Sequence, residues 1–318
     1  MIIVFDRSVR LRELCRTTTF LLGTLLLLSG CADNDWSTRK HVAEAGPCPV
    51  APVNVVVSVD QWGDIVTALG ANCAKVKTVL VSSAVNPHDY EPSPRDAAFF
   101  SGSQLVVVNG ADYDPWASKL AAKVVPKVPL INVATVTKTP DGDNPHLWYR
   151  PSAITALADA VTNELTRLSP SAAGYFATQR STFATELTPY DRLIARIKLT
   201  AAGKSYAATE SIFTYMAAAL GLTDKTPEGY RRAIANDTDP SPGDLAAFQR
   251  ELADHHIDVL VFNPQTQGSV QDQIRTVAQQ AGVPIVNTTE TVAANAESFE
   301  SWQTGQLASL ARALNVSN

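Results

Sequence analysis

The chain has 318 residues and a net charge of −5, which is long enough for two domains of ordinary size. Hydrophobic residues make up 45% and charged residues 18%, a balance that is typical of a folded globular protein and excludes a disordered chain. The 26 Lys and Arg residues form no basic run, so nucleic acid is not an expected partner. Because the chain holds only 5 His residues, any site that needs imidazole draws on a short set.

Residues 1–30 have the features of an export signal. A basic start is followed by an apolar stretch over 17–28, which is shorter than the ~20 residues that span a bilayer. The stretch ends in Leu-Ser-Gly-Cys, which resembles a bacterial lipobox. The resemblance implies cleavage before Cys31, a lipid on its sulfur and a place at the outer face of the cytoplasmic membrane. An ordinary secretory signal with a chance cysteine is the alternative. Residues 31–52 are predicted to be a tether, because they lack periodicity and are rich in proline.

Cys48 and Cys73 are the cysteines left once the signal is removed and Cys31 carries a lipid. An even pair in an oxidising compartment predicts a disulfide. By the chain-entropy model, closing its loop of about 25 residues would contribute ~3 kcal/mol to stability. A two-cysteine metal site is the alternative, but the spacing is long and no histidine lies near in the sequence.

Strands and helices alternate over residues 53–150. The β-branched run Val53–Val59 is typical of a strand buried on both faces, and helical spacing of apolar residues follows over 60–69. Further strands are predicted at 75–82, 104–109 and 129–134, and further helices at 95–101 and 115–125. This alternation predicts βαβ units and a parallel sheet, the N-terminal α/β lobe.

The region 151–201 shows no strand pattern. One helix is predicted over 152–168, and Ser169 with Pro170 begins a second as its N-cap and first helical residue. That second helix continues to residue 201, and Pro189 should kink or split it. We therefore expect 151–201 to be a stiff helical connector.

The alternation resumes over 202–318, which predicts a C-terminal α/β lobe. Strands are expected at 204–209, 258–262 and 283–287, and helices at 212–220, 241–255, 269–281 and 297–314. The predicted fold class is thus α/β: two parallel-sheet lobes joined by one long rigid helix, with a ligand cleft between the lobes. In such sheets, ligands bind at the carboxyl ends of the strands.

Two histidines occur in the same tripeptide, Asn-Pro-His. His88 and His146 each end one copy, and each proline stiffens the loop that holds the imidazole. A single histidine in a loop is more often structural or solvated. Because the repeated tripeptide uses two of only five histidines, we interpret both as metal ligands.

Two carboxylates follow predicted strands in the second half of the chain. Glu210 comes directly after 204–209, and Glu290 comes shortly after 283–287. Either one alone would be a surface or helix-capping residue. Together with His88 and His146 they make a set of four ligands, two from each lobe, that suits Mn²⁺, Fe²⁺ or Zn²⁺. A dication would offset the repulsion between the carboxylates, so its binding should draw the lobes together.

Several motifs resemble the zinc/manganese solute-binding lipoproteins of ABC transporters, the cluster A-I binding proteins. The resemblance is carried by Asn-Pro-His-Asp-Tyr-Glu-Pro at 86–92, Asn-Gly at 109–110, Pro-His-Leu-Trp at 145–148 and the long central helix. It covers nearly the whole mature chain. It implies two α/β lobes joined by one long helix, with the metal between the lobes.

The resemblance also implies which residues bind the metal. The first two ligands of the family fall on His88 and His146, and the third falls on Glu210. The fourth, usually Asp, falls on Glu290, although a shift of one residue would place it on Thr289. The implied protein is no enzyme. It is a lipid-anchored monomer that captures Mn²⁺ or Zn²⁺ and hands it to an ABC permease.

The sequence favours Mn²⁺ slightly over Zn²⁺. The third ligand is His in many zinc-type members of the family and Glu in manganese-type members, and here it is Glu210. Many zinc-type members also carry a His-rich loop before the second ligand, whereas residues 135–145 contain no histidine. Carboxylates favour harder ions, although raw affinity still rises toward Zn²⁺.

Two other functions remain open from the sequence. A metal-dependent hydrolase could use the same two His and two Glu, but no His-Glu-x-x-His or similar motif is present. A protein that binds a siderophore or corrinoid chelate would need a roomier cleft lined with aromatic side chains. Tyr90, Trp116 and Trp148 are the candidates for such a lining.

Overall fold

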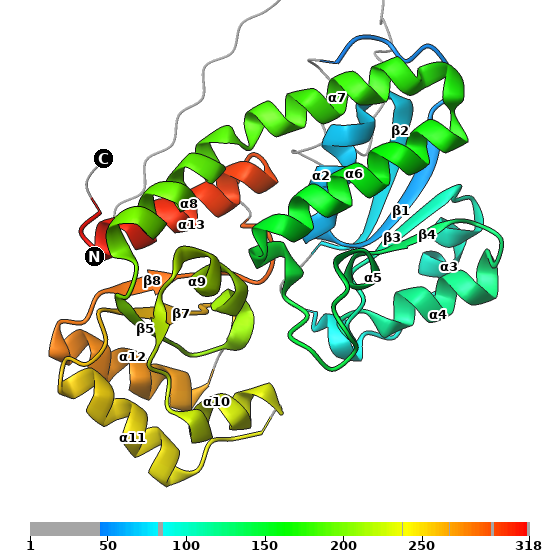
Figure 1. Cartoon of the computed structure of the whole chain (residues 1–318). Coiled ribbons are helices and arrows are strands. Elements are labelled where there is room, and N and C mark those ends of the chain that lie inside the picture. Colours follow the sequence, from blue (N-terminus) through cyan, green and yellow to red (C-terminus); the bar gives the residue numbers. More distant parts are fainter. Residues whose placement is uncertain (1–44, 82–84, 237, 267, 294–295, 317–318) are drawn as a thin grey trace, which may run out of the picture. The chain divides into compact units, whose positions relative to one another are not determined.

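A computed structural model describes residues 45–81, 85–236, 238–266, 268–293 and 296–316. The predicted export signal, Cys31 and the first part of the predicted tether lie outside the described residues. The described part contains two four-stranded parallel sheets, in the orders β2-β1-β3-β4 and β6-β5-β7-β8 (Figure 1). This is the predicted α/β fold class. Of the helices in the described ranges, none has both the length and the apolar character needed to cross a membrane.

The first sheet is built around β1 (Val53–Val59), which pairs with β2 (Ala74–Leu80) and β3 (Leu105–Val108). All residues of β1 except Asn54 are buried, as a valine-rich run in a central parallel strand requires. The remaining elements of this half are α2 (Asp60–Gly70), α3 (Pro94–Ser101), α4 (Pro115–Val124), β4 (Leu130–Asn132) and α5 (Val133–Thr137).

The strand predicted at 129–134 is too long. The side-chain oxygen of Asn132 accepts a hydrogen bond from the backbone N–H of Thr135 over 3.0 Å and caps a short helix. The strand β4 therefore ends at Asn132, and the apolar residues after it belong to α5.

The second sheet has β5 (Ser205–Ala208) and β7 (Val259–Phe262) at its centre, with all strands parallel. The short strand β6 and the helix α10 were not predicted, because the first has two residues and the second buries only Tyr230. The remaining elements are β6 (Thr223–Asp224), β8 (Ile285–Asn287), α9 (Thr214–Leu220), α10 (Glu228–Ala235), α11 (Pro242–Ala253), α12 (Ser269–Ala281) and α13 (Phe299–Ala313).

The region between the sheets consists of helices α6 (Pro151–Leu168), α7 (Ala173–Glu186) and α8 (Thr188–Ala201). The second predicted helix is split, and Pro189 lies in the first turn of α8, where its missing N–H is tolerated. Leu187 keeps helical backbone angles, so α7 and α8 follow one another along nearly one line (Figure 1).

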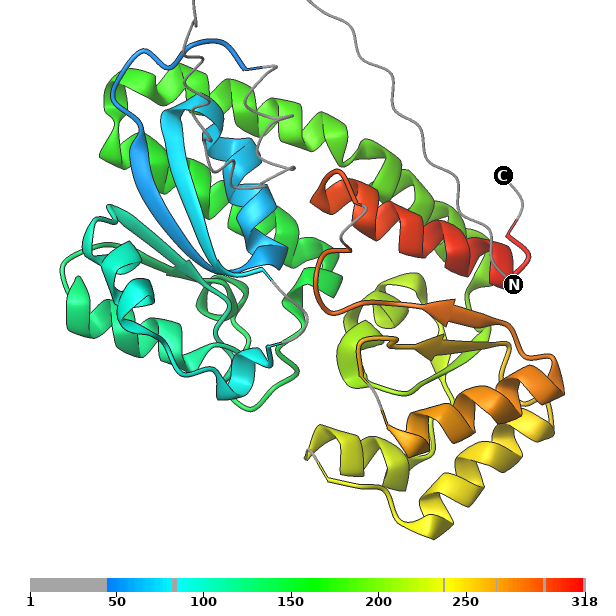
Figure 2. The same ribbon diagram turned by 180° about the vertical axis from the view of Figure 1, so that it is seen from behind.

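The chain's last helix, α13, returns to the earlier helices. It packs against α8 and α2, and it lies beside α8 in both views (Figures 1 and 2). The backbone N–H of Phe299 donates to the carboxylate of Asp64 in α2 over 2.7 Å, and Trp302 donates to the hydroxyl of Thr289 over 2.8 Å. These bonds fix both ends of the loop between β8 and α13, which carries Glu290.

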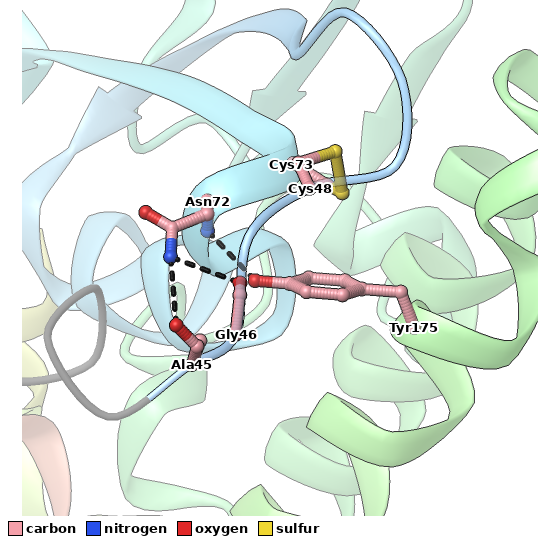
Figure 3. The surroundings of a disulfide bond; sticks show 6 residues. All are labelled: Ala45, Gly46, Cys48, Asn72, Cys73 and Tyr175. Atoms are coloured by element: carbon pink, nitrogen blue, oxygen red, sulfur yellow. Dashed lines mark hydrogen bonds between the residues drawn. A yellow bond between two sulfur atoms is a disulfide. The ribbon is translucent and has the colours of Figure 1, made fainter.

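The predicted disulfide is present between Cys48 and Cys73, whose Cα atoms are 5.0 Å apart. Next to it, the side-chain amide of Asn72 donates to the carbonyls of residues 45–46 over 2.9 and 3.1 Å. The backbone N–H of Asn72 donates to the hydroxyl of Tyr175 in α7 over 3.0 Å (Figure 3). The segment before β1 is thereby fastened to the end of α2.

Candidate metal site

Each Asn-Pro-His tripeptide forms the same turn. The side-chain oxygen of Asn86 accepts from the backbone N–H of His88 over 3.1 Å, and that of Asn144 accepts from His146 over 3.0 Å. The asparagine closes the turn and the proline fixes the backbone between them. The repetition that singles out the two histidines in the sequence therefore has a structural basis: each asparagine orients the histidine two residues later.

The contacts of both imidazole rings assign their tautomers. His88 Nδ1 lies 3.0 Å from the carbonyl oxygen of Asp112, which can only accept, so Nδ1 carries the proton. His146 Nδ1 lies 2.7 Å from the Asn144 side-chain oxygen, which already accepts the backbone N–H of His146. In the neutral rings, both Nε2 atoms therefore keep the lone pair that a metal ligand needs.

The carbonyl that faces His88 belongs to a strained turn. Gly110, Ala111 and Asp112 have successive positive φ angles of 77°, 48° and 59°. A side chain at Gly110 would also collide with Asn132, so glycine is required there. Non-glycine residues in this region cost of order 1–3 kcal/mol each and persist only where their surroundings hold them.

Asp114 is the group that holds this turn. Its buried carboxylate accepts from the backbone N–H groups of Asn109 and Gly110, each over 2.8 Å, and from the hydroxyl of Ser58. Burial raises the pKa of Asp114, although these hydrogen bonds oppose the rise. Asn109 extends the network, because its amide donates to the carbonyl of Pro145, the residue before His146, over 2.9 Å.

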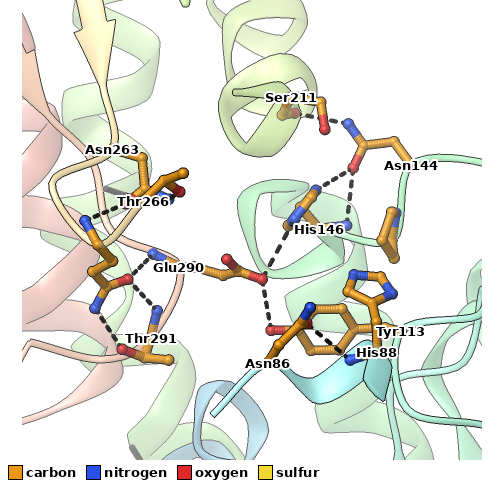
Figure 4. A network of polar contacts seen from close by, with 12 residues as sticks. Asn86, His88, Tyr113, Asn144, His146, Ser211, Asn263, Thr266, Glu290 and Thr291 are labelled. Atoms are coloured by element: carbon orange, nitrogen blue, oxygen red, sulfur yellow. Dashed lines mark hydrogen bonds and ion pairs between the residues drawn. The ribbon is translucent and has the colours of Figure 1, made fainter. Parts of the chain in front are cut away.

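Tyr113 lies between the two histidines. Its buried ring makes edge contacts with His88 and His146, at centroid distances of 5.0 and 6.1 Å. Its hydroxyl donates to Oε1 of Glu290 over 2.9 Å (Figure 4). Burial, followed by the charge of Glu290, raises the pKa of Tyr113 well above its ordinary value, so the hydroxyl remains a donor.

Glu290 reaches the histidines from the other half of the chain. Its Oε1 atom lies 3.7 Å from His146 Nε2. Burial alone would raise the pKa of Glu290. The hydrogen bond and positive charge of His146 in its protonated form, the Tyr113 hydroxyl and the positive charge of protonated His88 lower that pKa below its ordinary value. The result is an anionic carboxylate beside an imidazole nitrogen, and such a pair attracts a dication.

Glu210 follows β5 and begins a short 3-10 helix, Ser211–Phe213. Its half-buried side chain lines a cavity of about 30 Å³ together with Tyr230 and Arg231. Burial and the charge of Glu210 raise the pKa of Tyr230. The next residue, Ser211, accepts the side-chain amide of Asn144 over 2.8 Å, so the backbone beside Glu210 contacts the His146 loop.

The structure thus groups His88, His146 and Glu290 around Tyr113, and it places Glu210 in a separate small cavity. Across residues 45–316, leaving aside the positions not described, no three His, Cys, Asp or Glu side chains converge closely enough to hold a metal ion. The assignment of all four as ligands remains a prediction, as does the choice between Glu290 and Thr289.

The aromatic residues considered for a chelate site are divided. Tyr90 and Trp116 line a cavity of about 550 Å³ whose rim includes His88. Trp148 is fully buried and contacts Tyr113 and His146 instead. It therefore supports the ring positions of the candidate site and does not line that cavity.

Three residues of this network were not singled out by the sequence. Tyr113 and Gln61 follow β3 and β1, so their place near strand ends was the available signal. Asn144 belongs to the repeated tripeptide, in which the histidine is the residue that indicates a metal ligand. Gln61 donates to the Tyr113 hydroxyl over 3.2 Å and to the backbone carbonyl of Glu290 over 2.9 Å.

Comparison with known proteins defines the class. The fold is that of two-lobed α/β solute-binding proteins for metals. The structure of the SBP FpvC from Pseudomonas aeruginosa in complex with Mn²⁺ aligns with a TM-score of 0.68 and 21% identity, covering 84% of this chain and 100% of that one. The chain belongs to the ZnuA family, which is described as the periplasmic component A of a zinc-uptake complex. The model of this family matches residues 55–313.

Curated relatives agree with this assignment. The high-affinity zinc uptake system protein ZnuA of Bacillus subtilis (strain 168) is 23% identical over 234 residues, which is 67% of this chain and 71% of that protein. The zinc-binding lipoprotein AdcA of Streptococcus pneumoniae is 22% identical over 254 residues, or 73% of this chain. This chain spans about half of the length of AdcA, 48%. The predicted family is confirmed, and no comparison supports a hydrolase.

Proposed function

We propose that this chain is an extracytoplasmic solute-binding protein that captures Mn²⁺ or Zn²⁺ and delivers it to an ABC permease. The proposal rests above all on the hydrogen bonds of the two imidazoles. His88 and His146 both use Nδ1 as a donor to the protein and so keep Nε2 for a metal, and His146 Nε2 faces the anionic Glu290. Membership of the ZnuA family supports the same function.

The donor set suits a transition-metal cargo. Two imidazole nitrogens and two carboxylates bind Mn²⁺ or Zn²⁺, with the carboxylates favouring the harder ion and raw affinity favouring Zn²⁺. Glu290 already lies beside His146. Glu210 would complete the set from its separate cavity, and a dication would offset the repulsion that two close carboxylates otherwise feel. Four protein ligands would leave no open position for a reacting water, which is the arrangement of a carrier and not of a catalyst.

The anchor and the partner form a further part of the proposal. The lipobox-like sequence that ends at Cys31 supports a lipid anchor at the outer face of the cytoplasmic membrane, with 31–52 as a tether. We further propose that the protein acts as a monomer. The predicted parts 53–150, 151–201 and 202–318 would then be the first lobe, connector and second lobe of the carrier. A Cys31→Ser variant should leave the membrane fraction, and its retention there would contradict the anchor.

Calorimetric titration of the metal-stripped mature protein with Mn²⁺ and with Zn²⁺ tests the function. His88→Ala and Glu210→Ala should each weaken binding tenfold or more, because each removes one ligand. His256→Ala is the matched control, since His256 is exposed and pairs with Glu251 over 3.3 Å. Unchanged affinity in either ligand variant would contradict the site. If excess metal of either kind fails to raise the melting temperature, the chelate function is favoured instead.

A further inference from the structure

The backbone of Glu290 is held by a glutamine of helix α2, which follows a strand of the first sheet. Gln61 is the second residue of α2 and is fully buried. Its amide nitrogen donates to the carbonyl oxygen of Glu290 over 2.9 Å and to the Tyr113 hydroxyl over 3.2 Å. The same Tyr113 hydroxyl donates to the Glu290 carboxylate. Gln61 and Tyr113 therefore hold the main chain and the side chain of Glu290 at once.

A second glutamine holds the other side of the same residue. Gln265 follows β7, and its side-chain oxygen accepts from the backbone N–H groups of Glu290 and Thr291 over 2.7 and 3.1 Å. Its amide nitrogen donates to the Thr291 hydroxyl over 2.6 Å. Both main-chain polar groups of Glu290 are thus bonded to buried or half-buried amides, one from helix α2 and one from the loop after β7.

Two acidic residues extend the hold of α2 on this loop. The carboxylate of Asp60 accepts from the backbone N–H of Val292, and that of Asp64 accepts from Phe299. The first turns of α2 therefore form hydrogen bonds with three residues between β8 and the start of α13: Glu290, Val292 and Phe299. A loop held in this way has already lost the conformational freedom that a ligand residue would otherwise lose when metal binds.

We propose that Gln61 is a positioning residue that fixes Glu290 beside His146 before metal arrives. The inference rests on the proposed function and deepens it. Its consequence is that His146 and Glu290 already lie side by side in the metal-free protein, and that the approach of the remaining ligands completes the site. Groups that orient metal ligands in this way change metal affinity by about 10- to 100-fold when removed.

The test uses Gln61→Met in the mature protein, because methionine keeps the volume and removes the donor. We expect metal affinity to fall about tenfold or more, with a matching increase in the rate at which a chromogenic chelator strips Zn²⁺ from the loaded protein. The matched control is Gln303→Met. Gln303 is equally buried, and neither of its amide atoms has a hydrogen-bond partner in the part of the chain that the structure describes.

A double-mutant cycle separates positioning from general destabilisation. If Gln61 acts through Glu290, Gln61→Met should have no further effect on affinity in a Glu290→Ala background. A further tenfold loss in that background would overturn the proposal. So would wild-type affinity and stripping rate in Gln61→Met alone. If Gln61→Met fails to fold, Gln265→Met removes the hydrogen bonds that reach Glu290 from the loop after β7, and the same result is expected.

The outcomes also distinguish this inference from the proposed function. A wild-type protein that binds neither Mn²⁺ nor Zn²⁺ would overturn both. A wild-type protein that binds metal and is weakened by Glu290→Ala but not by Gln61→Met or Gln265→Met would overturn the positioning role alone.

Discussion

The hydroxyl of Tyr113 donates to Oε1 of Glu290 over 2.9 Å, although 177 residues separate the two in the chain. Tyr113 follows a strand of the first sheet and Glu290 follows a strand of the second. The tyrosine ring also touches both candidate ligand histidines. The side chain of Tyr113 therefore contacts three of the four predicted ligands. A metal at this site would bind either Oε1 of Glu290, which already accepts the Tyr113 hydroxyl, or Oε2.

Tyr113→Phe should weaken metal binding about tenfold, because it removes a donor that orients a ligand carboxylate while keeping the ring. The loss of this donor should also raise the pKa of Glu290 toward its ordinary value, since the hydroxyl is one of the groups that lower it. Calorimetric titration measures the affinity. Tyr190→Phe is the control, since its buried hydroxyl has no hydrogen-bond partner within the described ranges. Equal affinity in Tyr113→Phe and wild type would contradict the prediction.

His146 should be the Nδ1-protonated tautomer in the metal-free neutral protein. Asn144→Leu should remove that preference, because the side-chain oxygen of Asn144 is the acceptor that defines it. Imidazole ¹⁵N chemical shifts report the tautomer directly. We also expect metal affinity to fall about 10- to 100-fold in the variant. A spectrum in which wild-type His146 already carries its proton on Nε2 would contradict the assignment.

Replacing both bridged cysteines, Cys48→Ser with Cys73→Ser, should lower the free energy of unfolding by about 3 kcal/mol. Metal affinity should not change, because the bridge joins the segment before β1 to the end of α2 and touches no candidate ligand. Urea unfolding and metal titration of the same preparation check both parts. A large loss of metal affinity in the folded variant would show that the bridge acts on the site.

Asp60 should make the metal-free protein less stable as the pH rises. Burial raises its pKa from 3.8 to about 7, with hydrogen bonds from Val292 and others opposing and the charge of Glu290 adding to the rise. Between these two pKa values the folded state keeps a proton that the unfolded state has released, so the free energy of unfolding falls as the pH increases. The neutral variant Asp60→Asn lacks this dependence.

Thermal melts of metal-free wild type and Asp60→Asn at pH 5 and pH 8 test this. Relative to wild type, the variant should be more stable at pH 8 than at pH 5. The same difference in melting temperature at both pH values would show that Asp60 titrates in the folded protein as it does in the unfolded chain.

Local patterns predicted most of the strands and helices. The valine run of β1 is found with its predicted bounds, and the proline at 189 splits the long helix as its missing N–H requires. The errors occurred where local signals are short or ambiguous. Asn132 caps a helix inside an apolar run that is also compatible with a strand, and β6 has only two residues.

The candidate site was predictable only in part. A repeated tripeptide singles out His88 and His146, and a position after a strand singles out Glu290. Gln61 and Tyr113 belong to the site because they form hydrogen bonds with Glu290. The sequence around either residue does not indicate that it lies near Glu290, which follows a strand of the other sheet. Such contacts depend on how the two sheets and α13 pack, and that packing is set by the whole core.

Helix α2 has 11 residues and is therefore about 16 Å long. Residues at its beginning contact the loop of Glu290. The residues just past its end form the disulfide and bond to the carbonyl of Ala45. The segment before β1 and the loop of Glu290 are thus held at opposite ends of one helix. The fastening of the segment before β1 therefore makes no contact with the candidate metal site.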